Sequence, residues 1–505
     1  MSLPRGFLVT VILATAACSS SSDDAAPDGG RSSSTTAAVT VPLGPPVAVE
    51  LEGPITGGQR DLPYNAMPEG FEEQYGYTEE EWFVSGEATS YTASGPLTED
   101  GRWSVEAAAT SRYTTRIVVR HPVDPADFNG VVLVEWNNVT IGRDSDPDFG
   151  FLHPEVLGAG YAYVGVSAQQ VSIEGGDGLL EIPGVPAEAV VPLKVWDPER
   201  YAPLSHPGDD YAYDIFSQIG ALVEGRAEAN PLAGFSPTAV IALGESQSAS
   251  RLVTYVNAVQ PLADTYDGVL IHSRGGGAAP LRVDPPALPP NGTLVRTDLD
   301  VPVLIFQTET DLGILGFLAA RQPDAKHVIT WEVAGTAHAD QSTLDYGIAS
   351  GSRWSDAGAG INLTQLCGAA NAGPQPEVAR AALERLRAWV VDGTPPPAGP
   401  LLETTAESEI ARDADGNALG GIRTPAVDAP ISSLTGKGSD ASVFCSLFGQ
   451  ERPFTPERLA ELYPTHEAYV EAVTASADET VEAGFLLDAD RDAIVAEAER
   501  SGVGR

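Results

Sequence analysis

The chain contains a series of almost unbroken apolar runs, at 131–136, 161–167, 239–243, 268–272, 301–307 and 327–333. Strands that are buried on both faces read this way, which is typical of a parallel sheet covered by helices. Segments with a helical pattern lie between the runs, as at 210–228 and 248–259. These crossovers are long enough to connect parallel strands. The pattern predicts an α/β fold with a mostly parallel, doubly wound sheet.

Other strand patterns come before this core. Residues 47–53, 81–92 and 114–122 are β-branched or aromatic and are bounded by Gly or Pro, which predicts antiparallel N-terminal strands. After residue 400 the pattern predicts a hairpin with loops and then short helices. We therefore expect a core over 46–400 and a C-terminal hairpin and helical extension, packed on that core, over 401–505.

The first 18 residues have the pattern of a secretory signal. The apolar run 6–17 is too short to span a bilayer, and it meets Cys18 after two alanines. This resembles a bacterial lipoprotein signal in which Cys18 is lipidated, although Thr15 stands where that family usually has Leu. An ordinary signal peptide is the alternative. Both predict a protein outside the cytoplasm, either secreted or held at the bacterial cell membrane by a lipid anchor alone.

Composition adds three expectations. Residues 19–45 are rich in Ser, Thr, Ala, Asp and Pro without an apolar period, which predicts a disordered tether. The net charge of −41 over 505 residues disfavours nucleic acid as a partner. Cys367 and Cys445 form an even pair in an oxidising compartment, where we expect a disulfide rather than two free buried thiols. No pattern predicts an oligomeric state.

The stretch GESQS follows the apolar run 239–243 and precedes a helix pattern. Ser246 would then lie on a strand-to-helix turn, where helix N–H groups and the helix dipole can stabilise an oxyanion. The nucleophile-elbow pattern is G-x-S-x-G, and Ser248 replaces its last glycine. The motif alone fits a plain turn as well as a nucleophile.

A serine nucleophile needs a base and an orienting acid. Glu309 and Asp311 follow the run 301–307, and His338 follows the run 327–333. The order serine, acid, histidine is that of α/β-hydrolases. We predict His338 as the base and favour Asp311 as the acid. Glu309 remains the alternative, because it is closer to the strand end and has a longer reach.

Further site residues follow from this arrangement. We expect the oxyanion to be bound by the backbone N–H of Gln247 and by a donor of Asn137 or Asn138. Substrate-pocket candidates near strand ends and turns are Trp136, His206, His272 and Arg274. The sequence contains no zinc-ligand spacing, Walker loop or dinucleotide fingerprint, so we expect no metal and no cofactor.

The blocks VVLVEWNNVT, SHPGDDYAYDIFSQ, GESQSASRL and WEVAGTAHAD are similar to those of secreted or lipoprotein-type bacterial α/β-hydrolase-domain proteins. The resemblance covers most of residues 50–400. It implies the α/β-hydrolase fold and a site of Ser246, Asp311 or Glu309, and His338. We expect a carboxylic ester hydrolase that acts on a small-molecule ester through an acyl-enzyme. The alternatives are an amidase or lactonase, and a catalytically inactive surface-binding lipoprotein.

Overall fold

The computed structural model describes residues 45–182, 190–354 and 363–505. The predicted signal, the lipidation at Cys18 and all but the last residue of the predicted tether lie outside these ranges. The described residues belong to one compact unit. None of their helices is long and apolar enough to cross a membrane.

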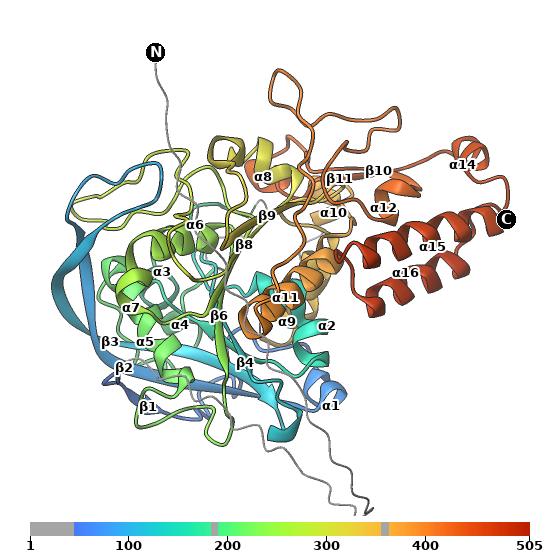
Figure 1. Ribbon diagram of the computed structural model, residues 1–505. Coiled ribbons are helices and arrows are strands. Elements are labelled where there is room, and N and C mark those ends of the chain that lie inside the picture. Colours follow the sequence, from blue (N-terminus) through green and yellow to red (C-terminus); the bar gives the residue numbers. More distant parts are fainter. Residues whose placement is uncertain (1–44, 183–189, 355–362) are drawn as a thin grey trace, which may run out of the picture. The chain divides into compact units, whose positions relative to one another are not determined.

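Nine strands of the described ranges form one sheet in the order β1-β2-β3-β5-β4-β6-β7-β8-β9 (Figure 1). Strands β1, β2 and β3 pair antiparallel, β3 also pairs antiparallel with β5, and the remaining pairs are parallel. The predicted mostly parallel sheet with antiparallel N-terminal strands is confirmed. The strands are β1 (Glu50–Glu52), β2 (Tyr77–Ala93), β3 (Val105–Pro122), β4 (Val131–Trp136), β5 (Ala162–Val166), β6 (Ala239–Glu245), β7 (Gly268–His272), β8 (Val303–Gln307) and β9 (Val328–Glu332).

Helices cover both faces of this sheet. Helices α5 (Ala212–Glu224) and α6 (Gln247–Thr254) pack in one core cluster, and α2 (Pro147–Gly158) and α11 (Gln375–Asp392) pack in the other. Successive residues of β4 enter opposite clusters: Val132 and Val134 contact the first, whereas Val131 and Leu133 contact the second. Because both faces are buried, every residue of β4 is shielded from water, which explains why all of them except Glu135 are apolar.

The remaining α-helices and a π-helical turn connect or extend these layers. They are α1 (Phe71–Tyr75), α3 (Gln170–Glu174), α4 (Leu193–Trp196), the π-helical turn η4 (Tyr255–Val259), α7 (Gln260–Ala263), α8 (Glu309–Gly313), α9 (Gln341–Trp354), α10 (Leu363–Cys367), α12 (Pro425–Asp428), α13 (Val443–Ser446), α14 (Pro456–Leu462), α15 (His466–Glu482) and α16 (Asp488–Arg500). A separate hairpin joins β10 (Ser432–Thr435) and β11 (Gln450–Pro453).

The topology creates a crevice at the carboxyl end of the sheet. From β4 the chain passes to β5 on one side, whereas β6 pairs with β4 on the other side. In open α/β sheets, such a reversal separates the loops that follow the two strands and leaves room for a ligand. The loop after β4 and the turn after β6 therefore border the same space.

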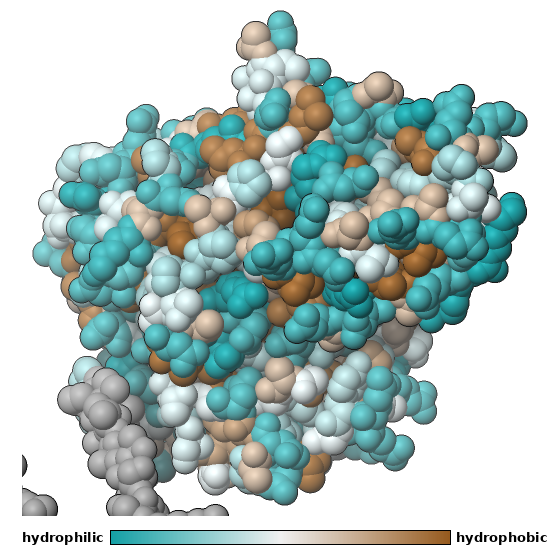
Figure 2. Space-filling view, turned by 45° about the vertical axis from the view of Figure 1, so that its right-hand side comes forward, coloured by the Kyte–Doolittle hydropathy of each residue, from teal (hydrophilic) through white to brown (hydrophobic). Residues whose placement is uncertain are grey.

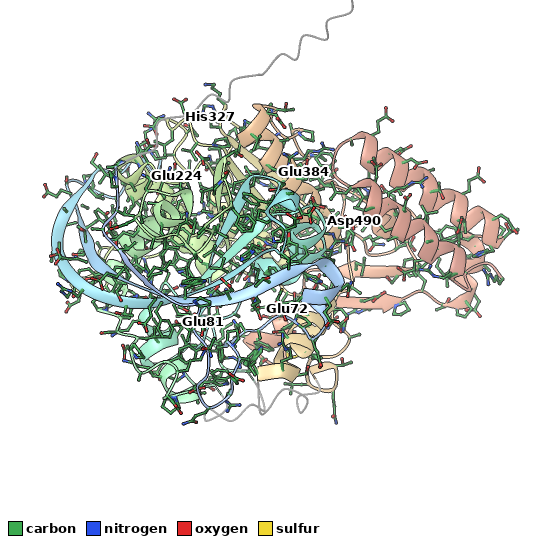
Figure 3. The ribbon with its side chains drawn as sticks, turned by 90° about the horizontal axis from the view of Figure 1, so that it is seen from below. Glu72, Glu81, Glu224, His327, Glu384 and Asp490 are labelled. Atoms are coloured by element: carbon green, nitrogen blue, oxygen red, sulfur yellow. A yellow bond between two sulfur atoms is a disulfide. The ribbon has the colours of Figure 1, made fainter. Side chains whose placement is uncertain are left out.

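The C-terminal segments contact the core through backbone and charged groups. Residue Ile422 bridges Val333 in parallel, just beyond β9. The guanidinium of Arg380 on α11 contacts the carboxylate of Asp490 on α16 at 2.6 Å. Figure 3 shows Asp490 where the C-terminal helices meet the rest of the described chain.

The surface reflects the acidic composition. On the face shown in Figure 2, hydrophilic side chains predominate and hydrophobic ones form small separate patches. The sequence has 70 acidic against 29 basic residues. Several of the arginines do not lie on this surface but are buried in ion pairs with acidic side chains. Glu81, labelled in Figure 3, lies on β2 and accepts hydrogen bonds from both Arg116 and Arg200.

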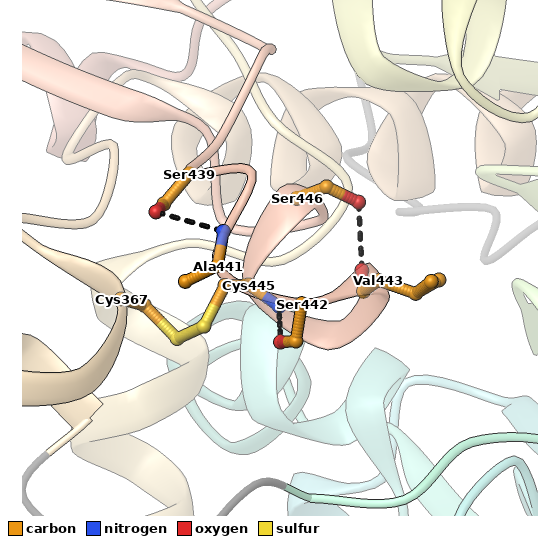
Figure 4. Close-up of a disulfide and its surroundings, with 7 residues drawn as sticks. All are labelled: Cys367, Ser439, Ala441, Ser442, Val443, Cys445 and Ser446. Atoms are coloured by element: carbon orange, nitrogen blue, oxygen red, sulfur yellow. Dashed lines mark hydrogen bonds between the residues drawn. A yellow bond between two sulfur atoms is a disulfide. The ribbon is translucent and has the colours of Figure 1, made fainter.

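Cys367 and Cys445 form a disulfide, as the cysteine count predicts (Figure 4). The two residues are 78 positions apart, and the bond joins α10 to α13. Closing a loop of this length removes conformational freedom from the unfolded chain. The disulfide therefore holds the segment around α13 against the core.

Replacing Cys445 with Ser should lower the free energy of unfolding by about 2 to 5 kcal/mol, because the unfolded chain regains the entropy of the open loop. Thermal unfolding followed by circular dichroism measures the change. Cys367→Ser should have the same effect, and a reductant should lower the melting temperature of the wild type but not that of either variant. Equal melting temperatures with and without the disulfide would contradict this.

Candidate active site

Ser246 lies on a tight turn between β6, which ends at Glu245, and α6, which begins at Gln247. Its backbone has φ 60° and ψ −112°, a conformation that residues other than glycine rarely adopt. The hydrogen bond from its N–H to the carbonyl of His272, at 2.9 Å, holds this turn against β7. The strained turn projects the hydroxyl from the carboxyl end of the sheet.

Close packing around the turn explains the neighbouring small residues. A Cβ on Gly244 would lie 2.9 Å from Cδ1 of Leu252 and 3.1 Å from the backbone carbon of Ser248, so a side chain at this position would crowd α6. Ser248 itself is fully buried. A serine is therefore accommodated where the elbow pattern usually has its second glycine.

The structure brings Ser246, His338 and Asp311 together. Nε2 of His338 lies 2.7 Å from Oγ of Ser246, and Nδ1 lies 2.7 Å from Oδ1 of Asp311. When Nδ1–H donates to Asp311, the lone pair of Nε2 faces the serine hydroxyl. This geometry suits an imidazole that accepts the proton of Ser246.

Asp311 is fixed by its own helix start. Its Oδ2 accepts hydrogen bonds from the N–H of Thr308 at 2.7 Å and from the hydroxyl of Thr308 at 2.8 Å. The side chain is fully buried. The loop that carries His338 is tied to the same helix, because the N–H of His338 donates to Oγ1 of Thr310. Acid and base therefore keep a constant relative position.

Glu309, the alternative acid, points away from His338. Its Oε2 accepts from Arg412 at 2.6 Å and from the N–H of Gly436 at 3.1 Å. Its Oε1 accepts from the N–H of Gly335 at 2.7 Å. Glu309 thus ties the C-terminal segment to the loop that carries His338.

The expected oxyanion donors differ in whether their N–H groups already have a hydrogen-bond partner. The N–H of Gln247 belongs to the first turn of α6, where N–H groups have no partner within the helix. The backbone N–H groups of Asn137 and Asn138, the other expected donors, are already engaged, because they donate to the carbonyls of Val166 and Ser145.

The side chain of Asn138 is also engaged, since Nδ2 donates to Glu245. The next residue in the loop, Val139, lines the cavity beside Ser246. Its N–H has only a long contact, 3.5 Å, to the side chain of Gln247. The backbone N–H of Val139 is therefore less engaged than the backbone N–H groups of the two asparagines.

A cavity of about 590 Å³ opens beside Ser246. One part of its wall is apolar, with Val139, Leu180 and Leu315, and another is formed by the side-chain-free stretch Gly275–Gly277. Its polar part contains Arg251, whose guanidinium lies 2.7 Å from Asp209. The cavity can hold a substrate of mixed polarity against the serine.

None of the four pocket candidates is among the described residues that line this cavity. Trp136 is buried in the core and donates its indole N–H to Gln169, which does line the cavity. His206 contacts the carbonyl of Ala168 through Nε2.

The other two candidates are fully buried. His272 donates to Asp148 through Nδ1, at 2.7 Å. Arg274 donates to the carbonyls of Gly275, Gly277 and Thr293 and so shapes the glycine-rich loop instead of binding a ligand directly. The sequence placed these four residues near strand ends and turns, but their side chains turn into the protein.

The sequence interpretation missed Glu245, the residue before the serine. Its Oε1 lies 3.2 Å from Nε2 of His338, and its side chain is 7% exposed. Burial opposes the imidazolium, but Glu245 and Asp311 outweigh it and raise the pKa of His338 to about 9. Consecutive strand residues alternate in direction, so the motif gave no signal that Glu245 and Ser246 both reach His338.

No cluster of three or more His, Cys, Asp or Glu side chains suited to a metal ion occurs in the described part of the chain. The protein groups beside the cavity include the hydroxyl of Ser246 and the imidazole of His338.

Solved structures that match part of this chain include several hydrolases. A putative dienelactone hydrolase from Klebsiella pneumoniae subsp. pneumoniae MGH 78578 is 13% identical, with 54% of this chain and 95% of that chain covered and a TM-score of 0.28. The esterase Est22 is 16% identical, with 57% and 81% covered and a TM-score of 0.28. A glucuronoyl esterase from Solibacter usitatus is 11% identical, with 62% and 75% covered and a TM-score of 0.25.

No curated protein matches this chain. The family model described as alpha/beta hydrolase domain matches residues 51–496, which include every strand of the main sheet except the first residue of β1. The strand-to-helix turn at Ser246 and the order of serine, acid and histidine agree with that description. The chain belongs to the alpha/beta hydrolase domain family.

Proposed function

We propose that this protein is a serine hydrolase that cleaves carboxylic esters through an acyl-enzyme on Ser246. The observation that carries the proposal is the chain of two 2.7 Å contacts from Oγ of Ser246 through His338 to Asp311. These two contacts bring a nucleophile, a base and an orienting acid within hydrogen-bonding distance of one another.

In the acylation step, the proton of Ser246 moves to Nε2 of His338 while Oγ bonds to the ester carbonyl carbon. The carbonyl π electrons move to the oxygen and form a tetrahedral oxyanion. In this proposal the backbone N–H groups of Gln247 and Val139 bind the oxyanion, because both residues line the cavity beside Ser246. When the carbon–oxygen bond to the alcohol breaks, His338 returns its proton to the leaving oxygen.

In the deacylation step, water takes the place of the alcohol. His338 removes a proton from the water as its oxygen attacks the acyl carbon, and then returns this proton to Oγ of Ser246 as the acid departs. Asp311 keeps the imidazole in the tautomer that both steps need. We favour an ester over an amide because an alkoxide leaves at a lower barrier from the same set of groups.

We also propose that the enzyme works outside the cytoplasm, with a lipid anchor at Cys18 as its only membrane attachment. The disulfide between Cys367 and Cys445 supports this location, since disulfides persist in oxidising compartments. The signal-like first 18 residues support it independently. The proposed substrate is a small-molecule ester that fits the cavity beside Ser246.

A fluorophosphonate should label the wild-type protein at Ser246, because the hydroxyl is activated by His338 and its phosphonylation mimics acylation. Ser246→Ala should abolish both the labelling and the hydrolysis of a panel of p-nitrophenyl esters. Mass spectrometry of the labelled peptide identifies the modified residue. A folded wild-type protein that neither labels nor hydrolyses any ester would overturn the proposal, and matched ester and amide substrates separate the two activities.

Asp311→Asn should lower kcat by about 10³- to 10⁴-fold, because the asparagine no longer holds the required imidazole tautomer. Glu309→Gln is the matched control: it should retain most of the turnover but lose about 1 to 3 kcal/mol of stability, since Arg412 loses its ionic partner. Steady-state kinetics and thermal unfolding of both variants distinguish the roles. A greater loss of kcat in Glu309→Gln than in Asp311→Asn would reverse the assignment of the acid.

A further inference from the structure

A second carboxyl group contacts the imidazole at the nitrogen that faces the serine. Oε1 of Glu245 lies 3.2 Å from Nε2 of His338, the same atom that lies 2.7 Å from Oγ of Ser246. The carboxyl group is held in place from the other side, because Nδ2 of Asn138 donates to Oε2 at 3.2 Å and to the Glu245 carbonyl at 3.1 Å. The contact is thus fixed by packing and hydrogen bonding.

The surroundings of Glu245 are rich in titratable groups. His338 and Asp311 face it from the loop after β9 and from α8, and His272 and Asp148 face it from β7 and α2. Glu245 and His272 are partners in the register of β6 and β7. Glu245 therefore lies between two histidine–aspartate pairs, each with an Nδ1-to-carboxylate distance of 2.7 Å.

This environment favours retention of a proton. Burial raises the pKa of Glu245 to about 7, although the two imidazoles act against the rise. The charge of Glu245 is in turn the largest influence that favours the imidazolium of His338 against burial. A proton near this cluster is therefore shared between a carboxyl group and an imidazole that are in direct contact.

We propose that Glu245 is a positioning residue for the hydrolysis: through its contact with Nε2, it shares a proton with His338 and sets the pH at which the imidazole becomes free to deprotonate Ser246. The inference rests on the proposed function. It adds a fourth member to the group of serine, histidine and aspartate, and this member acts on the nitrogen that exchanges the proton.

Ionised Glu245 affects the basicity of His338 in two ways. An ionised Glu245 stabilises the imidazolium, and a protonated imidazole cannot accept the proton of Ser246. The base form of His338 therefore appears only as the pH rises through the pKa of about 9. Once formed, this imidazole is a stronger base, and the same carboxylate stabilises the imidazolium that develops as Ser246 attacks. Glu245 neither gains nor loses a bond over the cycle.

The test is the pH dependence of fluorophosphonate labelling, which needs no knowledge of the substrate. In the wild type, the labelling rate should rise with pH as His338 loses its proton. Glu245→Gln keeps the shape of the side chain and an oxygen for Asn138 but removes the charge. Its midpoint should fall by about one to three pH units, the usual effect of one neighbouring charge. Glu245→Asp retains the charge at a greater distance and should have a midpoint between the two.

Glu135→Gln is the matched control, because Glu135 is a fully buried carboxyl group on β4 that hydrogen-bonds to Tyr163 and to the start of α2. Its midpoint should equal that of the wild type. An unchanged midpoint in both Glu245 variants, with folding verified by circular dichroism, overturns the inference. An equal shift in Glu135→Gln overturns it as well, because the effect would then not depend on contact with His338. Wild-type protein that fails to label at any pH instead refutes the proposed function.

Discussion

The backbone of Ser246 is the constraint on which the site depends. A non-glycine residue with φ 60° stores conformational strain, and the strain is held by β6 on one side and α6 on the other. The turn allows a hydroxyl and the first N–H of a helix to face the same small space. That space lies where β4 and β6 separate the loops at the carboxyl end of the sheet. The fold therefore places the hydroxyl of Ser246 through the conformation of a single residue.

The C-terminal segments hold the acid and base loops in place. Glu309 binds Arg412 and Gly436, and the hydroxyl of Thr310 donates to the carbonyl of Gly436. The N–H of Ala339, next to His338, donates to the carbonyl of Leu447. These contacts lie close to the disulfide that joins Cys367 to Cys445. The part of the chain beyond residue 400 is thus integrated with the loops that carry Asp311 and His338, and the family match extends to residue 496.

Two further buried acids, Asp148 and Glu135, are engaged by partners other than His338. Asp148 bonds to His272, and Glu135 accepts hydrogen bonds from Tyr163 and from the N–H groups of Asp148 and Phe149. Burial and its acidic neighbours raise the pKa of Glu135 far above its usual value. Glu135 therefore retains a proton, which avoids repulsion between its carboxyl group and those of Asp148 and Asp146.

The sequence by itself determined the strands, because segments buried on both faces must be apolar, and it determined the order of Ser246, acid and His338 along the chain. It did not reveal α2, because Pro154 and the buried Asp148 interrupt the helical pattern there. Only the tertiary structure decided that Asp311 and not Glu309 reaches the imidazole, that Val139 lines the cavity beside Ser246, and that Glu245 contacts His338. The sequence shows which strand end a residue follows. The direction of its side chain depends on turns and on partners from distant segments of the chain.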